Sequence, residues 1–256
     1  MVRLASGIIL AAAAVAAILF LPIQALRVVA VFVAGLAAHE YLQIVGTRGA
    51  LPQGVAIAAT MVLCASVALQ TRLEPAILLL VALGWVAVMV LSGRTLHDAA
   101  ADLVAPVYVG APLGMLVVLH VLQGWRATLL LVTLVVVSDS AQYYSGRMFG
   151  RHALAPSISP KKTIEGAVGG LICGTLFMVF VGARLFPEAG LVSLGLLGLT
   201  VVVLGVCGDL FESRLKRTAG MKDSSALIPG HGGILDRIDA LLFAAPAFYV
   251  AVRSLV

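Results

Sequence analysis

The chain has 256 residues, of which 61% are hydrophobic and 11% are charged, and its mean hydropathy is +1.10. Soluble globular chains are about 45–50% apolar and about 25% charged, so this composition excludes a soluble globular enzyme. It is also the opposite of the composition of a disordered chain. The net charge of +5 does not indicate nucleic-acid binding, because the basic residues lie in short segments between apolar runs. A polytopic membrane protein remains.

Nine apolar runs are long enough to cross a bilayer as helices, which takes about 20 residues each. They cover residues 6–24, 27–46, 52–70, 75–93, 103–123, 126–145, 164–185, 189–208 and 239–255. The runs are continuous rather than alternating, which excludes a membrane β-barrel. The first run follows Arg3, as in a secretory signal, but it is long for the apolar part of one, so we favour a span. The sequence therefore predicts an all-α polytopic membrane protein with about nine spans.

Two connections between the predicted spans are long and basic, at residues 146–163 and 209–238. Two spans separate these connections, so they lie on the same side of the membrane, and the positive-inside rule makes that side cytoplasmic. With nine spans the N-terminus is cytoplasmic too, and twelve of the 17 basic residues fall on that side. The charge distribution therefore agrees with the predicted number of spans.

The composition divides the chain near residue 124. Residues 1–123 are predicted to form N-terminal transmembrane helices with short loops, whereas residues 124–256 hold both basic connections and eight of the twelve acidic residues. We therefore place the chemistry in the second part. Small residues from Gly166 to Gly174 allow close helix packing within or between chains, so a homodimer stays open.

Four aspartates lie at the predicted cytoplasmic ends of three spans: Asp139, Asp209, Asp236 and Asp239. Asp236 and Asp239 are three residues apart and share one helical face. A carboxylate at membrane depth usually faces a cavity, a partner or an ion, although one such aspartate alone could simply cap a helix. Four together favour a shared cation site. Their oxygen ligands suit Mg²⁺, which commonly bridges carboxylates and substrate phosphates.

The connection before the last span combines basic side chains with glycines. Lys216, Arg217 and Lys222 precede Asp223, and a Gly-His-Gly-Gly turn occupies residues 230–233. Glycines let a backbone approach a ligand closely and turn its N–H groups toward an anion, and the next helix begins just after them. These features describe a site for a polyphosphate with a metal ion. Binding of anionic lipid head groups would explain the charges, but neither the aspartates nor the turn.

Two stretches of the second part carry recognisable motifs. Residues 213–239 read SRLKRTAGMKDSSALIPGHGGILDRID, and residues 138–150 and 158–166 read SDSAQYYSGRMFG and ISPKKTIEG. The first stretch resembles the defining signature of the phosphatidate cytidylyltransferase (CDP-diacylglycerol synthase) family, and the second resembles its second block. The resemblance covers residues 138–250; earlier it consists of the hydrophobic pattern and Glu40-Tyr41. One departure is Gln142-Tyr143, where the family would have an aromatic residue closer to the aspartate, and this puts the lipid preference in doubt.

The resemblance implies a Mg²⁺-dependent reaction in which CTP and phosphatidate give CDP-diacylglycerol and pyrophosphate, for phospholipid synthesis. An oxygen of the lipid phosphate would attack the α-phosphorus of CTP in line. We expect the enzyme to lie in a bacterial inner membrane, with its active site on the cytoplasmic side. A second cation, the use of dCTP and the acyl-chain preference stay open.

The resemblance also implies roles for individual residues. Asp209 and Asp236 are the first-choice metal ligands, followed by Asp139, Asp239 and Asp223. The expected catalytic set is Asp209, Asp236, Lys222, Asp223 and His231. The groups expected to bind the phosphates of the two substrates are Ser213, Lys216, Arg217, Arg237, Lys161, Lys162, Thr163, Gly232 and Gly233.

Two of these assignments leave alternatives open. His231 either donates a hydrogen bond to the leaving pyrophosphate or only shapes the turn. Lys161, Lys162 and Thr163 lie on the other basic connection and would close over the same site, where Glu165 could support them without touching substrate.

Two other kinds of function stay open. A synthase that uses CTP on an ether lipid, or a CTP-dependent polyprenol kinase, would share parts of these motifs. A transporter with ion-binding aspartates would also suit nine spans. Transporter sites, however, usually lie near the bilayer midplane, whereas the polar residues here gather at one face. The helix pattern of the CDP-alcohol phosphotransferases is absent.

Overall fold

The computed structural model describes residues 2–46, 49–70, 75–91, 93–228, 230 and 232–255. His231 lies outside these residues, so its predicted role stays a prediction. The helices are α1 (Val2–Phe20), α2 (Ile23–Val45), α3 (Ala50–Ala68), α4 (Pro75–Leu91), α5 (Leu96–Ala105), the π-helix η1 (Pro106–Gly110), α6 (Ala111–Phe149), α7 (Ile164–Leu185), α8 (Leu191–Thr218) and α9 (Leu235–Leu255).

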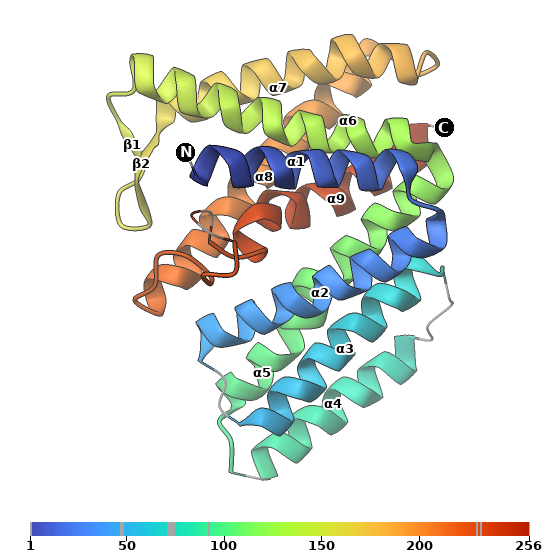
Figure 1. The fold of residues 1–256 in the computed structure, drawn as a ribbon, viewed down its shortest axis with the longest axis vertical. Helices are drawn as coiled ribbons and strands as arrows, with labels where there is room; N and C mark the ends of the chain where they lie inside the picture. Colours follow the sequence, from blue (N-terminus) through green and yellow to red (C-terminus); the bar gives the residue numbers. More distant parts are fainter. Residues whose placement is uncertain are drawn as a thin grey trace.

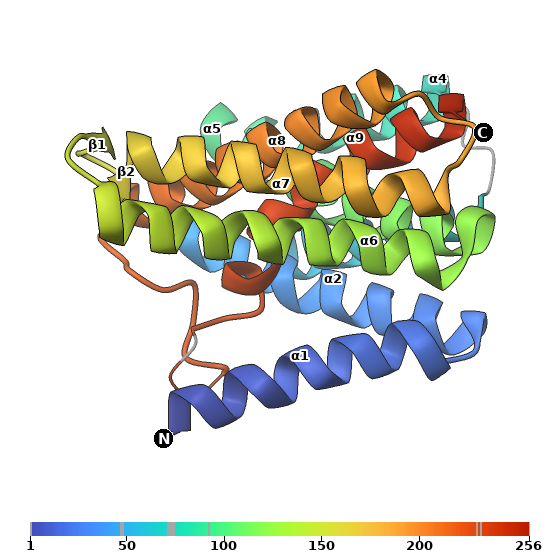
Figure 2. The same cartoon turned by 90° about the horizontal axis from the view of Figure 1, so that it is seen from above.

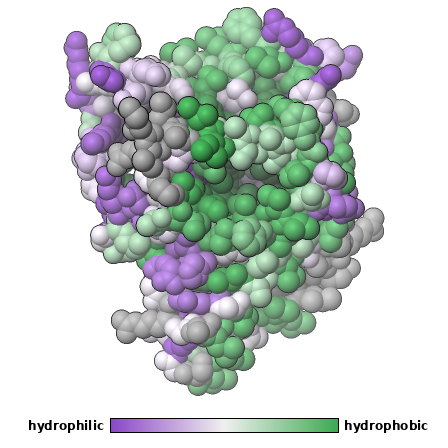
Figure 3. Space-filling view, viewed as in Figure 1, coloured by the Kyte–Doolittle hydropathy of each residue, from purple (hydrophilic) through white to green (hydrophobic). Residues whose placement is uncertain are grey.

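The helices run back and forth between two ends of the molecule (Figure 1). One end, at the left of Figure 1, carries the connections after α6 and after α8, and the other end carries the connection between α7 and α8. Figure 2 shows α1 lying along the outside of the bundle. In Figure 3 hydrophobic residues cover the middle of the visible face, and hydrophilic residues gather toward its two sides. This distribution is typical of a helical bundle that crosses a membrane.

Five helical segments of the described chain are long and apolar enough to cross a membrane. They are Ile23–Val45, Leu51–Ala68, Asp98–Phe149, Ile164–Leu185 and Leu191–Thr218. The third of these has 52 residues and turns sharply at Gly124, whose φ of 76° and ψ of 177° lie outside the helical region. Its two arms correspond to the predicted spans 103–123 and 126–145, so one glycine turns a single helical segment back on itself.

Two features differ from the sequence prediction. Residues 153–163 were expected to be a loop of an all-α protein, but β1 (Ala153–Ala155) and β2 (Ser159–Thr163) form an antiparallel hairpin. These strands are too short and polar for an alternating pattern to reveal them. In addition, α8 continues ten residues beyond the predicted end at residue 208. The hydropathy of the sequence falls at residue 208, which ends the predicted span, but the residues that follow remain favourable for a helix.

The buried side chains form two hydrophobic cores. The first lies between α6, α7, α8 and α9, and the second lies between α2, α3, η1 and the beginnings of α6 and α9. Helix α9 belongs to both cores, because Ala244 and Phe248 pack in the first and Leu235 and Leu242 in the second. The start of α9 is therefore fixed from both sides. The division of function at residue 124 stays a prediction.

Candidate active site

The structure brings the two basic connections together at one end of the bundle. Lys162 of β2 forms an ion pair with Asp209 of α8. Arg217, two turns further along α8, donates from Nε to the carbonyl oxygen of Ile158 in the hairpin at 3.2 Å. The hairpin therefore lies against the polar end of α8, and the prediction that the two connections share one side is confirmed.

Asp209 is the centre of one group of carboxylates. Its Oδ1 accepts a hydrogen bond of 3.3 Å from Ser213 Oγ, one turn further along α8. The charges of Asp139 and Asp239 lie within electrostatic range of Asp209, so α6, α8 and α9 each contribute one acid. The Asp209 side chain is 32% exposed and that of Lys162 is 23% exposed. A ligand can therefore reach this pair from outside the bundle.

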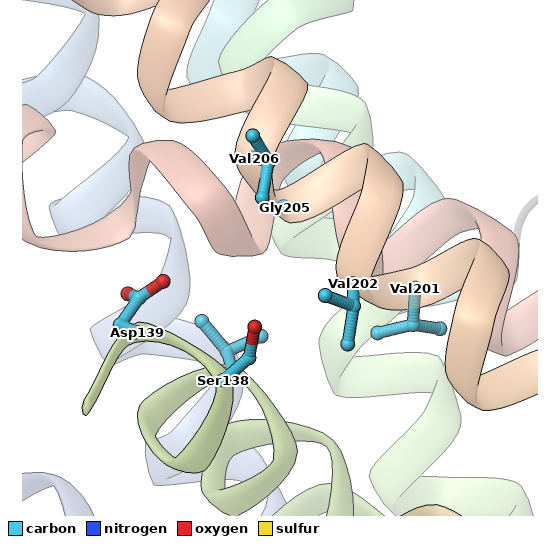
Figure 4. A pocket seen from close by; sticks show the side chains of 7 residues that line it. Ser138, Asp139, Val201, Val202, Gly205 and Val206 are labelled. Atoms are coloured by element: carbon cyan, nitrogen blue, oxygen red, sulfur yellow. The ribbon is translucent and has the colours of Figure 1, made fainter. Parts of the chain in front are cut away.

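Asp139 reaches this group from the second arm of α6, ten residues before the helix ends at Phe149. Its Oδ1 accepts 3.1 Å from Gln142 Nε2, and the same amide donates 3.2 Å to Ser138 Oγ. Figure 4 shows Ser138 and Asp139 facing α8 across a gap lined by Val202 and Gly205. This gap has no room for a water-sized molecule. It is a helix-packing gap, and the open part of the site is at Asp209.

Asp236 is the centre of a second, more buried group. It pairs with Lys216, and its Oδ2 accepts from Ser224 N at 2.9 Å, Ser224 Oγ at 2.8 Å and Gly233 N at 2.8 Å. Lys216 also donates to Glu212 at 2.5 Å. Burial alone would raise the pKa of Asp236, but Lys216 and the two backbone N–H groups outweigh burial and lower it to about 2. Asp236 is therefore ionised at neutral pH and already neutralised by a lysine.

The depressed pKa of Asp236 gives a prediction about acid stability. A carboxylate whose folded pKa lies below its unfolded value of about 3.9 stabilises the fold above that value, and this is lost as the pH falls toward the folded pKa. The stability of the wild type in detergent, measured by thermal unfolding, should therefore not change through titration of Asp236 between about pH 7 and about pH 4. Lys216→Met removes the counter-charge while Asp236 stays partly buried, so the folded pKa of Asp236 should rise. The loss of stability that the wild type shows between about pH 4 and about pH 2 should then become smaller or change sign in the variant. Identical pH profiles for the two proteins would contradict this pairing.

The glycines of the turn permit this packing around Asp236. Gly232 has a φ of +78°, and a Cβ atom there would overlap the Asp236 carboxylate. A Cβ atom at Gly233 would overlap Ser224 Oγ and the Glu40 carboxylate. Both positions therefore require glycine for conformation or space. In this structure the N–H of Gly233 points at Asp236, which is the anion that the turn holds.

Glu40 of α2 is a residue of the site whose role the sequence did not reveal. Its side chain accepts hydrogen bonds from Ser224 Oγ at 3.0 Å, Ser225 Oγ at 2.7 Å, Ile234 N at 3.1 Å and Leu235 N at 2.7 Å. It is only 4% exposed. Glu40 thus fixes both flanks of the loop that carries Gly232 and Gly233. A carboxylate inside an apolar run was the only signal for this role.

Two predicted residues organise the hairpin. Thr163 caps α7 by accepting from the N–H of Gly166 at 3.1 Å. Glu165 accepts from the N–H groups of Arg151 and His152 and from His152 Nδ1 at 2.6 Å. These contacts hold the start of the hairpin and so position Lys162. The remaining predicted residues, all exposed at this end of the molecule, are Lys161, Lys222, Asp223 and Arg237.

Four of the five predicted metal ligands are divided between the two groups, and the fifth, Asp223, is exposed. Asp139, Asp209 and Asp239 lie near one another, whereas Asp236 engages Lys216 and the loop. Within the described part of the chain, no three acidic, histidine or cysteine side chains are gathered closely enough to hold a metal ion. The oxygen donors suit a hard cation such as Mg²⁺, but they are not assembled around one point. Metal binding stays a prediction.

Comparison with known proteins matches one family model to almost the whole chain and finds relatives for about half of it. Residues 1–255 match the family model described as the Cytidylyltransferase family. A phosphatidate cytidylyltransferase of Haemophilus influenzae is 47% identical over 119 residues, which are 45% of this chain and 41% of the relative. That of Thermotoga maritima is 37% identical over 164 residues, 61% of this chain and 60% of the relative.

A protein of Escherichia coli named Uncharacterized protein YnbB is 42% identical over 139 residues, 54% of this chain and 46% of the relative. The matched regions thus span about half of the length of these curated relatives.

Proposed function

The chain belongs to the cytidylyltransferase family, and we propose on this premise that it transfers the cytidylyl group of CTP to phosphatidate, giving CDP-diacylglycerol and pyrophosphate. Relatives named phosphatidate cytidylyltransferase in Haemophilus influenzae and Thermotoga maritima support this choice of substrates. The observation that carries the proposal is the contact of the hairpin with α8. The bond from Arg217 to Ile158 joins the two blocks of sequence that resemble this family, and Lys162 pairs with Asp209 four residues before the second of them. This contact places basic and acidic side chains at one polar end of an apolar bundle, where a charged nucleotide can meet a lipid.

In this reaction the protein mainly has to position two anions, CTP and phosphatidate. An oxygen of the lipid phosphate forms a bond to the α-phosphorus of CTP, and the bond from that phosphorus to the bridging oxygen of the β-phosphate breaks, so that pyrophosphate leaves with the electron pair. The two phosphates repel each other, and catalysis therefore depends on orientation and charge neutralisation. Lys162 and Arg217 are placed to hold phosphates where the hairpin contacts α8. Lys222 and Arg237 lie exposed beside them.

Asp209, Asp139 and Asp239, together with the hydroxyl of Ser213, would have to draw together to hold Mg²⁺, because in this structure they do not surround one point. All are oxygen donors, and Lys162 is the cation that forms a direct ion pair with Asp209 among the described side chains. When bound, the metal would supply charge neutralisation for the phosphates. Asp236 would act through Lys216 and the loop. A second ion stays open.

The orientation in the membrane is part of the same proposal. The described helices alternate between two ends, and the arms on either side of Gly124 run in opposite directions (Figure 1). This alternation supports nine spans, and by the positive-inside rule the basic connections support an active site on the cytoplasmic side. The bacterial relatives make an inner membrane the expected location. The small-residue face of α7 packs against α6 and α8 within the chain, and a homodimer stays open.

The choice of acceptor lipid can be tested with CTP labelled at the α-phosphate. The purified full chain, with Mg²⁺ in detergent, should move label into chloroform-soluble product when phosphatidate is supplied. A diether analogue of phosphatidate should be a poorer acceptor. Label transfer to the diether analogue in preference to phosphatidate would contradict the proposed substrate. Absence of transfer to any acceptor would contradict the reaction.

A further inference from the structure

An apolar groove opens between α5, η1, α6, α8 and α9, and the proposed reaction gives it no role. Its volume is about 460 Å³, within the range of about 300–1,000 Å³ that is typical of small-molecule sites. Val104 of α5, Phe211 of α8 and Phe243 of α9 lie on its walls. Tyr108 of η1 is the lining residue with a hydroxyl group.

The hydroxyl of Tyr108 has no hydrogen-bond partner among the described residues, although it is buried. The residue is 7% exposed, and its ring packs edge-on against Phe211 at 5.1 Å and Phe243 at 6.1 Å between ring centroids. Buried hydroxyl groups are nearly always hydrogen-bonded, so an unpaired one calls for an explanation. The π-helical turn that presents Tyr108 is a rare local structure that occurs frequently at functional sites. An oxygen acceptor on a ligand in the groove would satisfy this hydroxyl.

The groove lies next to the carboxylates of Asp239 and Glu212. Phe243 lies one turn after Asp239 on α9, and Phe211 directly precedes Glu212 on α8. The charges of Glu212 and Asp239 lie within electrostatic range of the Tyr108 hydroxyl. Since α9 runs from the polar end into the apolar part of the bundle, its groove residues lie deeper in the bundle than Asp239. On the path from the polar end into the bundle, the carboxylates come first, the unpaired hydroxyl of Tyr108 comes next, and the apolar groove follows.

We propose that the groove holds one acyl chain of the phosphatidate substrate, with Tyr108 Oη donating a hydrogen bond to the ester carbonyl that joins this chain to glycerol. This inference rests on the proposed function and deepens it. The lipid presents a phosphate, an ester and an acyl chain in the same order as the groups along the path. Because membrane lipid is as apolar as the groove, the groove orients the substrate rather than attracting it. The groove should therefore affect kcat/KM for the lipid.

The test compares long and short lipids in two tryptophan variants. Val104→Trp fills the groove, whereas Val203→Trp places the same side chain at an exposed position of α8 outside it; the two valines are 39% and 42% exposed. Val104→Trp should lower kcat/KM for dipalmitoyl phosphatidate about tenfold, because a displaced chain misplaces the phosphate. Dibutanoyl phosphatidate is too short to need the groove and should lose less than about twofold, and KM for CTP should stay unchanged. Val203→Trp should behave as the wild type.

A second variant keeps the proposal testable if the tryptophan disturbs folding. Tyr108→Phe retains the ring and removes only the hydroxyl, so it should lower kcat/KM for diester phosphatidate about three- to tenfold, as expected for one hydrogen bond. It should not change kcat/KM for a diether analogue, which has no carbonyl. Equal losses at both chain lengths, or with both the ester and the ether, would overturn the groove assignment while leaving the reaction standing. A wild type inactive on phosphatidate of either length would overturn the proposed function itself.

Discussion

Replacing Asp209 by asparagine should lower kcat by about two to three orders of magnitude, as removal of a central electrostatic group in an active site does. Asp209 is where α8 meets the hairpin, through its ion pair with Lys162, and it also accepts a hydrogen bond from Ser213. Asparagine keeps the shape but removes the charge that faces the lysine and the expected metal. The change is measured as the initial rate of label transfer from CTP to lipid by the purified protein.

The control for this variant is Asp98→Asn. Asp98 lies in the first turn of α5, where its backbone N–H donates to the cap residue Thr95, and it has no part in the carboxylate groups. This variant should keep the wild-type rate. If Asp209→Asn retained more than about a tenth of the wild-type kcat while Asp98→Asn behaved normally, Asp209 would lose its central place in the site.

Replacing Glu40 by alanine should release the loop at residues 224–235 and lower kcat by about ten- to a hundredfold. The alanine leaves the N–H groups of Ile234 and Leu235 and the hydroxyl of Ser225 without the Glu40 acceptor, whereas the hydroxyl of Ser224 keeps Asp236. Each unsatisfied buried group costs about 1–3 kcal/mol. The loop then no longer holds Gly233 and Ser224 against Asp236. Glu40→Gln keeps one acceptor oxygen and should have an intermediate rate.

Limited trypsin digestion separates a released loop from general unfolding. Lys222 is exposed at the start of this loop, so cleavage after it should be faster in Glu40→Ala than in the wild type, while the helices stay protected. Glu188→Ala, at an exposed position between α7 and α8, is the matched control and should change neither the rate nor the cleavage pattern. Unchanged cleavage at Lys222 in Glu40→Ala would show that Glu40 does not hold the loop.

The helices could be located from sequence because their signals are local. Predicted span 164–185 coincides with α7, where Thr163 supplies an N-cap and Pro187 follows the helix end. The break at Gly124-Trp125 was also visible, and it is the point where the two arms of α6 separate. The hairpin was missed, because two short polar strands carry no periodic pattern. The extension of α8 to Thr218 was missed because a search for apolar runs stops at Asp209.

The candidate site could be predicted only in part, for a related reason. The two signature stretches contain most of its charged side chains, although not Asp209, Glu212 and Glu40, and they do not show which side chains pair. Lys162 and Asp209 are 47 residues apart, and Glu40 is 184 residues from Ser224; such contacts follow from tertiary packing, not from spacing. The sequence therefore grouped Asp236 with Asp209 as a metal ligand, whereas the structure turns Asp236 toward Lys216 and the loop.

The most direct measurement of the central claim uses CTP that carries distinguishable labels at the α- and γ-phosphates. The purified full chain is incubated with this nucleotide, Mg²⁺ and phosphatidate, and both labels are followed in the lipid and aqueous phases. Cytidylyl transfer predicts the α-label in chloroform-soluble lipid and the γ-label in pyrophosphate, in equal amounts. The γ-label in lipid would show a kinase, and both labels remaining in CTP would contradict the proposed reaction.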